Sequence, residues 1–248
     1  MHSSRTARSA RQQAPGHRGL LVVAAVLILL LQGLVPYGHL VLYPMTLLST
    51  WVHEMGHGVT ALLCGGRFEE LVLFADASGL ARSAVPRGWR EAATAAGGLL
   101  APPLCGAIIL RLARHAPRAL LAVLAGALLL SLLLWVRTAV GWAAMAPLLL
   151  LCLGVLRWGG TGGCLFFMQL VGLLLALDTV ARIGYLFVPA GMVGGIRRPS
   201  DVAGIAQVLG GSILVWGALL AGVSLALLLG GLVGALRAPR KELAPERG

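Results

Sequence analysis

Seven long apolar runs determine what this chain of 248 residues can fold into. Short polar or basic segments separate the runs, which cover residues 19–35, 40–64, 92–113, 119–136, 139–157, 163–188 and 208–236. A helix needs about 20 mainly apolar residues to cross the hydrocarbon core of a bilayer, and each run is near that length. The sequence therefore predicts an all-α polytopic integral membrane protein with six or seven transmembrane helices.

The number of spans and their orientation stay open. Run 19–35 is short, and only Arg137 interrupts the apolar region 119–157. Arginines before the first run place the N-terminus in the cytoplasm, and basic residues after the last run favour the same side for the C-terminus. Six spans satisfy both expectations, whereas seven do not. We expect a disordered basic tail over residues 1–18, one membrane-embedded domain over 19–236 and a charged tail over 237–248.

Composition supports a membrane protein and excludes other classes. Hydrophobic residues make up 58% of the chain and charged residues 12%, where a water-soluble domain carries about 25% charge. The net charge of +11 comes from basic residues at the termini and between apolar runs, which suits anionic lipid headgroups rather than nucleic acid. The scattered cysteines predict packing residues, with neither a disulfide framework nor a thiolate site: Cys64, Cys105, Cys152 and Cys164.

A metal-binding motif lies inside the second apolar run. His53-Glu54-Met55-Gly56-His57 has the HExxH pattern, which places two imidazoles one helical turn apart on one face. Both can bind one zinc ion, and the intervening glutamate then stands beside the metal-bound water as a general base. The alternative is a polar cluster that holds helices together. Burying three such groups without a metal or a partner is unfavourable, which favours a site for one Zn²⁺ per chain.

A catalytic zinc site needs a third protein ligand, and two aspartates are the candidates. Asp178 lies within run 163–188, where its alternative role is an ion pair with Arg182 at i+4. Asp201 follows Ser200, and its alternative role is that of a helix cap or a first-turn acid. The remaining acids have ordinary solvated or helix-terminal roles: Glu69, Glu70, Asp76, Glu91, Glu242 and Glu246.

The segment from Gly65 to about Arg90 is the only mixed, polar loop long enough to form structure of its own. Residues 67–74 have β character, 76–79 have the composition of a turn, and 80–85 can return as a second strand. We expect a short β-hairpin directly after the HExxH helix. It either accepts an extended substrate by strand addition or serves only as a connector, and the sequence leaves both roles open.

Several short motifs, taken in order, resemble the site-2 protease family of membrane-embedded zinc peptidases, and within it a compact group found in bacteria and plants. The similarity spans about residues 45 to 216. The matching segments are His53–His57, Ala61-Leu62-Leu63, Gly65-Gly66-Arg67, Ser78-Gly79-Leu80, Ala96–Pro102, Val136–Gly141 and Ser200-Asp201-Val202-Ala203. Small residues such as Gly97 and Gly98, and four glycines at 159–163, are expected to allow close helix packing or a cavity.

The resemblance implies a zinc metalloendopeptidase with His53 and His57 as metal ligands and Glu54 as the catalytic base. Site-2 proteases take their third ligand from an Asp-Gly turn, whereas Asp178 is followed by Thr179. The likeness of Asp201 to the aspartate of the compact group favours Asp201 as the third ligand, with Asp178 as the alternative. Thr138 stands where the family has an asparagine, so an oxyanion role is not carried over to that position.

The resemblance also implies a membrane protein or peptide as the substrate, with the lipid bilayer as the surroundings and a bacterial cell membrane as the location. Two other functions stay open. The chain is alternatively a non-catalytic membrane scaffold or regulator that keeps the metal motif, although a structural site has no need of Glu54. A transporter is the third possibility, but the sequence shows few membrane acids and no evident inverted repeat.

Overall fold

The structure is a computed structural model that describes residues 43–237. The predicted N-terminal tail, the apolar run 19–35 and residues 238–248 lie outside this part of the chain. The described part is mainly helical, with two short hairpins between the helices. The elements are α3 (Tyr43–Leu63), β1 (Arg67–Leu73), β2 (Gly79–Ala84), α4 (Trp89–Leu112), α5 (Pro117–Leu134), α6 (Ala139–Trp158), α7 (Gly160–Ala181), η2 (Ile183–Phe187), β3 (Ala190–Val193), β4 (Ile196–Pro199), α8 (Asp201–Leu209) and α9 (Ile213–Arg237).

The polytopic helical fold predicted from the sequence is confirmed. Within residues 43–237, five segments are long and apolar enough to cross a membrane: Trp89–Leu112, Pro117–Leu134, Ala139–Trp158, Gly160–Phe187 and Ile213–Ala235. The sixth described run forms α3, which carries the HExxH residues and is not among these five. Large apolar side chains are exposed on the outer faces of several spans, including Val123, Leu150 and Leu229, as lipid-facing helices require.

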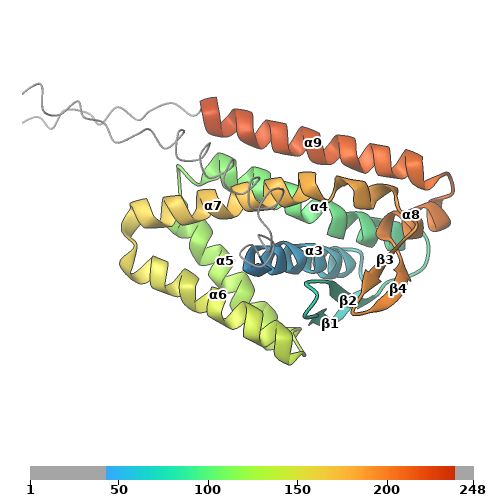
Figure 1. Cartoon of the computed structure of the whole chain (residues 1–248), viewed down its shortest axis with the longest axis horizontal. Helices are drawn as coiled ribbons and strands as arrows, with labels where there is room; N and C mark the ends of the chain where they lie inside the picture. The colour runs from blue at the N-terminus through green and yellow to red at the C-terminus, as the bar shows by residue number, and fades with distance from the viewer. Residues whose placement is uncertain (1–42, 238–248) are drawn as a thin grey trace, which may run out of the picture.

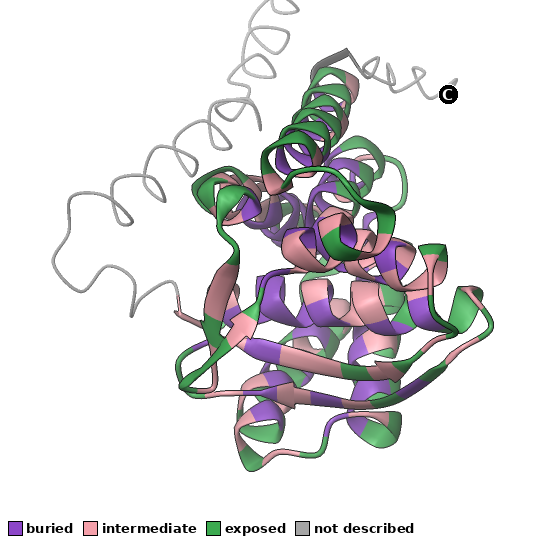
Figure 2. Cartoon of the chain, turned by 90° about the vertical axis from the view of Figure 1, so that its right-hand side faces the viewer, coloured by how far each residue is buried: buried purple, intermediate pink, exposed green. Residues whose placement is uncertain are grey.

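Helix α3 occupies the centre of the molecule. In Figure 1 it lies between the layer of α4 and α7 and the β1–β2 hairpin, while α9 covers the far side of α4. The view of Figure 2 shows buried positions on the inward-facing sides of these helices and exposed positions along the outside of α9. Trp51 of α3 is buried and donates a hydrogen bond from its indole N–H to Ser131 Oγ of α5 at 3.0 Å. The motif-bearing helix is therefore held on several sides.

Two of the predicted small-residue positions bring α3 and α4 together. A Cβ atom on Gly97 would lie 2.0 Å from Thr60 Oγ1, and one on Gly98 would lie 2.2 Å from the His57 ring. Gly56 on the opposing helix is equally tight, because its Cβ would lie 2.5 Å from Ala101 Cβ. The glycines at 159–163 lie instead at the turn between α6 and α7.

The predicted hairpin after α3 is confirmed as β1 and β2, which pair antiparallel with Leu71 opposite Ala81. The break between α5 and α6 packs against it, because Leu71 N–H donates to Trp135 O at 2.8 Å. Arg137 lies at this break and donates to the carbonyl of Leu134 near the end of α5. Thr138 caps α6, its hydroxyl accepting from Gly141 N–H at 3.1 Å. Both residues therefore mark helix ends.

A second hairpin, β3–β4, was not predicted from the sequence. It pairs antiparallel with Gly191 opposite Arg198 and turns at Gly194 and Gly195, both of which have positive φ. A Gly-Gly pair between short apolar segments is a recognised hairpin signal. The hairpin directly precedes α8 and so controls where Asp201 lies.

Candidate metal centre

The two histidines of the motif converge because they lie one turn apart on α3. His53 Nε2 and His57 Nε2 are 3.1 Å apart, and both side chains are largely buried. The Nδ1 atom of His57 lies 2.8 Å from the carbonyl oxygen of Thr94 on α4. A carbonyl only accepts hydrogen bonds, so His57 Nδ1 carries a proton, and Nε2 is the ring nitrogen that faces Asp201 and is left to bind a metal. Thr94 thus fixes the tautomer that metal binding requires.

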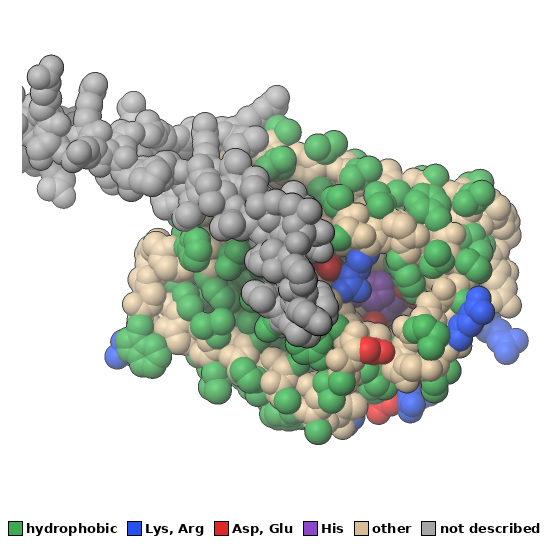
Figure 3. All heavy atoms as spheres, viewed as in Figure 1, with side chains coloured by type: hydrophobic (Ala, Val, Ile, Leu, Met, Phe, Trp, Pro, Cys, Tyr) green, Lys and Arg blue, Asp and Glu red, His purple; other side chains and the backbone are tan. Residues whose placement is uncertain are grey.

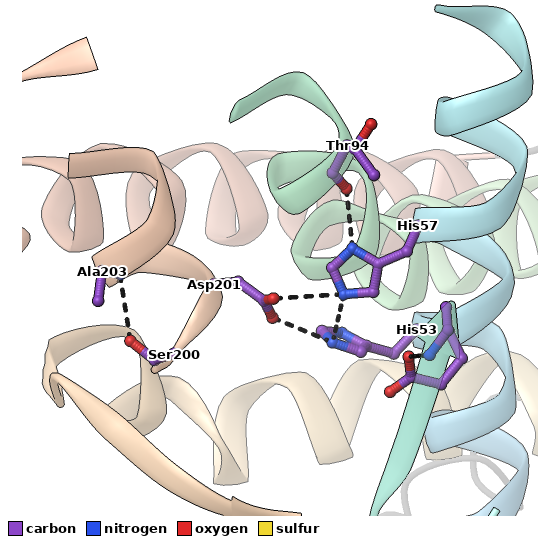
Figure 4. A network of polar contacts seen from close by, with 8 residues as sticks. His53, His57, Thr94, Ser200, Asp201 and Ala203 are labelled. Carbon is purple, nitrogen blue, oxygen red and sulfur yellow. Dashed lines mark hydrogen bonds and ion pairs between the residues drawn. The ribbon is translucent and has the colours of Figure 1, made fainter. Parts of the chain in front are cut away.

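Asp201 joins the two histidines from a distant part of the chain, as Figure 4 shows. Its Oδ2 lies 3.2 Å from His53 Nε2, and its Oδ1 lies 3.5 Å from His57 Nε2. Ser200 is the N-cap of α8, with its hydroxyl oxygen accepting from Ala203 N–H at 3.2 Å and its hydroxyl donating to Val188 O at 2.6 Å. Because Ser200 supplies the cap, the carboxylate of Asp201 is directed at the imidazoles.

The spacing of these three groups fits a zinc ion. With metal–ligand distances of about 2.0–2.1 Å, donors on a tetrahedral zinc are separated by about 3.3 Å. Here the two imidazole nitrogens are 3.1 Å apart and each lies 3.2 or 3.5 Å from an oxygen of Asp201, and one ligand atom from each of the three residues lies within 4.8 Å of the others. Two imidazoles and one carboxylate are also a donor set that zinc prefers in catalytic sites. The residues therefore fit the cation that the HExxH motif predicts.

The electrostatics of Asp201 favour a charged carboxylate. Burial opposes its ionisation, but the Coulombic attraction of His57 and hydrogen bonds from His53 and His57 outweigh burial and hold the pKa of Asp201 well below its usual range. A deprotonated carboxylate is the form that binds a metal.

Glu54 lies next to the cluster but has a different partner. Its side chain is buried, and Oε2 accepts a hydrogen bond from Ala81 N–H on β2 at 2.7 Å. Strand β2 approaches α3 closely enough for this contact because residue 79 is glycine, where a Cβ would lie 2.6 Å from Glu54 Cγ. The hairpin thereby orients the carboxylate that the motif assigns as the base.

A cavity of about 550 Å³ opens beside these residues. Its wall includes His53, Glu54, His57 and Asp201, together with residues of β2, α7 and the β3–β4 hairpin. Figure 3 shows histidine side chains at the base of a hollow in one face of the molecule, with basic and acidic side chains at its rim. A cavity lined by both polar and apolar groups has the character of a ligand-binding site.

Asp178, the alternative third ligand, lines the same cavity but makes other contacts. Ser49 donates its hydroxyl proton to Asp178 Oδ2, and Arg182 Nε lies 2.9 Å from the same carboxylate. The predicted i+4 pair with Arg182 is therefore present. Among the described residues, the group of possible metal ligands contains His53, His57 and Asp201, without Asp178.

The other described acids singled out in the sequence are not part of the group of possible metal ligands. Glu70 pairs with Arg82 across the hairpin at 2.9 Å, and Asp76 accepts from Ser78 N–H in the β1–β2 turn at 2.9 Å. Hydrogen bonds from the side chain and backbone of Ser78 lower the pKa of Asp76. Glu91 lies in the first turn of α4, as expected, and also lines the cavity.

Four cavity residues have roles that sequence reasoning missed: Ser49, Thr94, Tyr185 and Arg198. Thr94 acts through its backbone carbonyl, which has no sequence signature. Tyr185 and Arg198 lie on η2 and β4, and their proximity to the motif depends on long-range packing. For Arg198 the sequence holds a weak indication of a place near the site, because Arg198 precedes Asp201 by only three residues.

Comparison with known proteins gives one match. The profile of the family described as Peptidase M50B-like matches residues 20–231, which is most of the chain. Searches of curated proteins and of solved structures gave no match.

Proposed function

This chain belongs to the Peptidase M50B-like family, as its resemblance to site-2 proteases implied, and from that premise we propose that it is a zinc metallopeptidase that cleaves membrane-associated proteins. One observation carries the proposal. His53 and His57 from α3 meet Asp201 from α8 at the wall of a cavity that Glu54 also lines. A base and three possible ligand atoms meet here from two distant segments. This arrangement suits a catalytic site better than a polar cluster that only holds helices together.

The chemistry divides between the metal and the chain. A zinc ion held by His53, His57 and Asp201 would polarise the scissile carbonyl and bring the pKa of a water to about 7. Glu54 accepts a proton from the attacking water and delivers it to the leaving amine. Ala81 N–H holds the Glu54 carboxylate in place for both transfers, and Thr94 keeps the His57 ring oriented.

Strand β2 is suited to position an extended substrate. It pairs with β1 on one side, while Gly79, Leu80, Ala81 and Ser83 line the cavity on the other. In an antiparallel pair the N–H and C=O of one residue point to the same side, so the carbonyl of Ala81 faces the cavity together with its N–H. A substrate segment that pairs there by strand addition places its carbonyls beside Glu54. An intact helix hides its carbonyls, so the segment must unwind before cleavage.

Metal analysis and a cleavage assay together test the proposal. The purified protein, reconstituted in vesicles, is supplied with a panel of single-span reporter proteins that carry unrelated transmembrane segments. A peptidase binds about one zinc per chain and yields a product that Glu54→Gln abolishes while zinc is kept. If the wild type binds zinc but yields no cleavage product, the result favours the non-catalytic scaffold. If it moves a solute across the vesicle membrane without cleaving a reporter, the result favours a transporter. A wild type that binds no zinc after metal-replete preparation overturns the proposal.

A further inference from the structure

Arg198 is a cation of the cavity wall that has no partner among the residues that the structure describes. It lies on β4, and its Nε atom is buried without a hydrogen-bond partner in residues 43–237. Among the described residues no ion pair reaches its guanidinium group. A partly buried guanidinium without a counter-ion is unfavourable in a protein, and more so in one surrounded by lipid. Such a group is expected to have a ligand.

Most of the other charged groups of the cavity have partners among the described residues. Asp178 pairs with Arg182, Asp201 contacts both motif histidines, and Glu54 accepts from Ala81 N–H. Glu91 also lines the cavity, but no ion pair joins it to Arg198 in the described part of the chain. Within residues 43–237, Arg198 is therefore the cationic side chain of the cavity wall that no carboxylate pairs with, whereas Arg182 is paired with Asp178.

The register of the β3–β4 hairpin shows which face carries this charge. Gly191 pairs with Arg198, and side chains of directly opposed residues lie on the same face of a sheet. A Cβ on Gly191 would lie 3.0 Å from Tyr185 Cε2, so this face packs on the Tyr185 ring. Tyr185 and Arg198 both line the cavity that Asp201 also lines, whereas Arg197, the exposed neighbour of Arg198, is not part of its wall.

We propose that Arg198 binds a carboxylate of the substrate and so selects peptide segments with an acidic group near the scissile bond. A guanidinium presents parallel N–H donors that match a carboxylate, and such charge-assisted bonds are strong where water is scarce. The carboxylate is either an acidic side chain or the C-terminal carboxylate of a peptide. This assignment rests on the proposed peptidase function, because it names a feature of that enzyme's substrate.

The first arm measures cleavage by the full-length, zinc-loaded protein in detergent. The probes are internally quenched peptides of one apolar sequence, with a single Glu moved along it, each matched to a Gln peptide and prepared with a free or an amidated C-terminus. The wild type is expected to prefer one acidic peptide by about ten- to a hundredfold in kcat/KM, the range of one charge-assisted hydrogen-bond pair. Arg198→Gln loses this preference between the Glu and Gln peptides, whereas the control Arg197→Gln keeps it.

The second arm measures binding without turnover, which separates this inference from the proposed function. The same peptides are titrated against the Glu54→Gln protein, with and without Arg198→Gln. Preferential binding of acidic peptides that needs Arg198 supports the carboxylate site even if no peptide is cleaved. A preference that follows the moved Glu identifies a side chain, and one that follows the free C-terminus identifies the terminal carboxylate.

The inference is overturned if the wild type cleaves and binds the Glu and Gln peptides equally. It is also overturned if the preference for the acidic peptide survives in Arg198→Gln, or if Arg198→Gln and Arg197→Gln lose that preference equally. Competition by added phosphatidic acid that depends on Arg198, while the peptides show no charge preference, overturns it as well, because Arg198 would then bind a lipid phosphate.

Discussion

Gly194 N–H donates a hydrogen bond to Ser78 Oγ at 2.9 Å, joining two residues that are 116 positions apart in the chain. Ser78 lies in the turn of the hairpin that follows the HExxH helix, and Gly194 in the turn of the hairpin that leads to Asp201. Phe74 reinforces the contact, because a Cβ on Gly194 would lie 2.6 Å from its ring. The two halves of the candidate site are therefore joined at their hairpin tips as well as through the contacts of Asp201 with His53 and His57.

We predict that Ser78→Ala loosens the second hairpin without unfolding the protein. The substitution removes the acceptor for Gly194 N–H and the bond that the Ser78 hydroxyl donates to Asp76, each contributing about 0.5–1.5 kcal/mol. Hydrogen exchange of the amides in residues 190–199 should become about tenfold faster. Ser83→Ala is the matched control, because Ser83 also lines the cavity but has no such hydrogen bond. Unchanged exchange in Ser78→Ala would show that the hairpins are held together elsewhere.

The two candidate aspartates should respond differently to substitution. Asp201→Asn replaces a charged ligand atom with a weaker one, and we expect zinc affinity to fall by at least about a hundredfold. Asp178→Asn should keep its zinc, because Asp178 contacts Ser49 and Arg182. Zinc content of both purified variants, measured by elemental analysis, decides between them. Loss of zinc from Asp178→Asn alone would transfer the third ligand to α7.

Sequence patterns predicted the helices, the first hairpin and the local part of the site for simple reasons. Spans are long apolar runs, and His53, Glu54 and His57 are neighbours on one helix, so their geometry follows from helical periodicity. Asp201 was chosen over Asp178 by resemblance alone. What separates the two in the structure is their contacts: Asp201 lies beside both imidazoles, whereas Asp178 contacts Ser49 and Arg182.

Long-range packing accounts for what the sequence could not supply. The contact between Thr94 and His57 uses a backbone carbonyl, and the contact between Ala81 and Glu54 uses a backbone N–H, so neither depends on a recognisable side chain. Strands β3 and β4 have only four residues each, too few to show a clear alternation of apolar and polar side chains. Arg198 lines the cavity only because of where that hairpin packs, and the sequence does not show this.

The close approach of α3 and α4 should make position 98 unusually sensitive. Gly98→Ala places a Cβ within 2.2 Å of the His57 ring, so the ring must move away from Thr94 O and from Asp201. We expect zinc binding to weaken by about ten- to a hundredfold, as for the loss of a supporting contact. Gly163→Ala is the matched control, because the space around its Cβ is open. Equal zinc contents in the two variants would mean that the helices shift apart without disturbing His57.

Glu54→Gln should separate metal binding from catalysis. The amide has the size of the carboxylate, and its oxygen can still accept from Ala81 N–H, so the packing of β2 against α3 is preserved. Glutamine cannot take up the proton of the attacking water, and the loss of a general base is expected to lower kcat by about 10²–10⁴-fold. His53, His57 and Asp201 remain, so zinc content should stay near that of the wild type. Zinc content and cleavage of the preferred reporter are measured on one preparation, with Glu91→Gln as the control for removing a cavity carboxylate. If Glu54→Gln retains wild-type turnover, another group must act as the base.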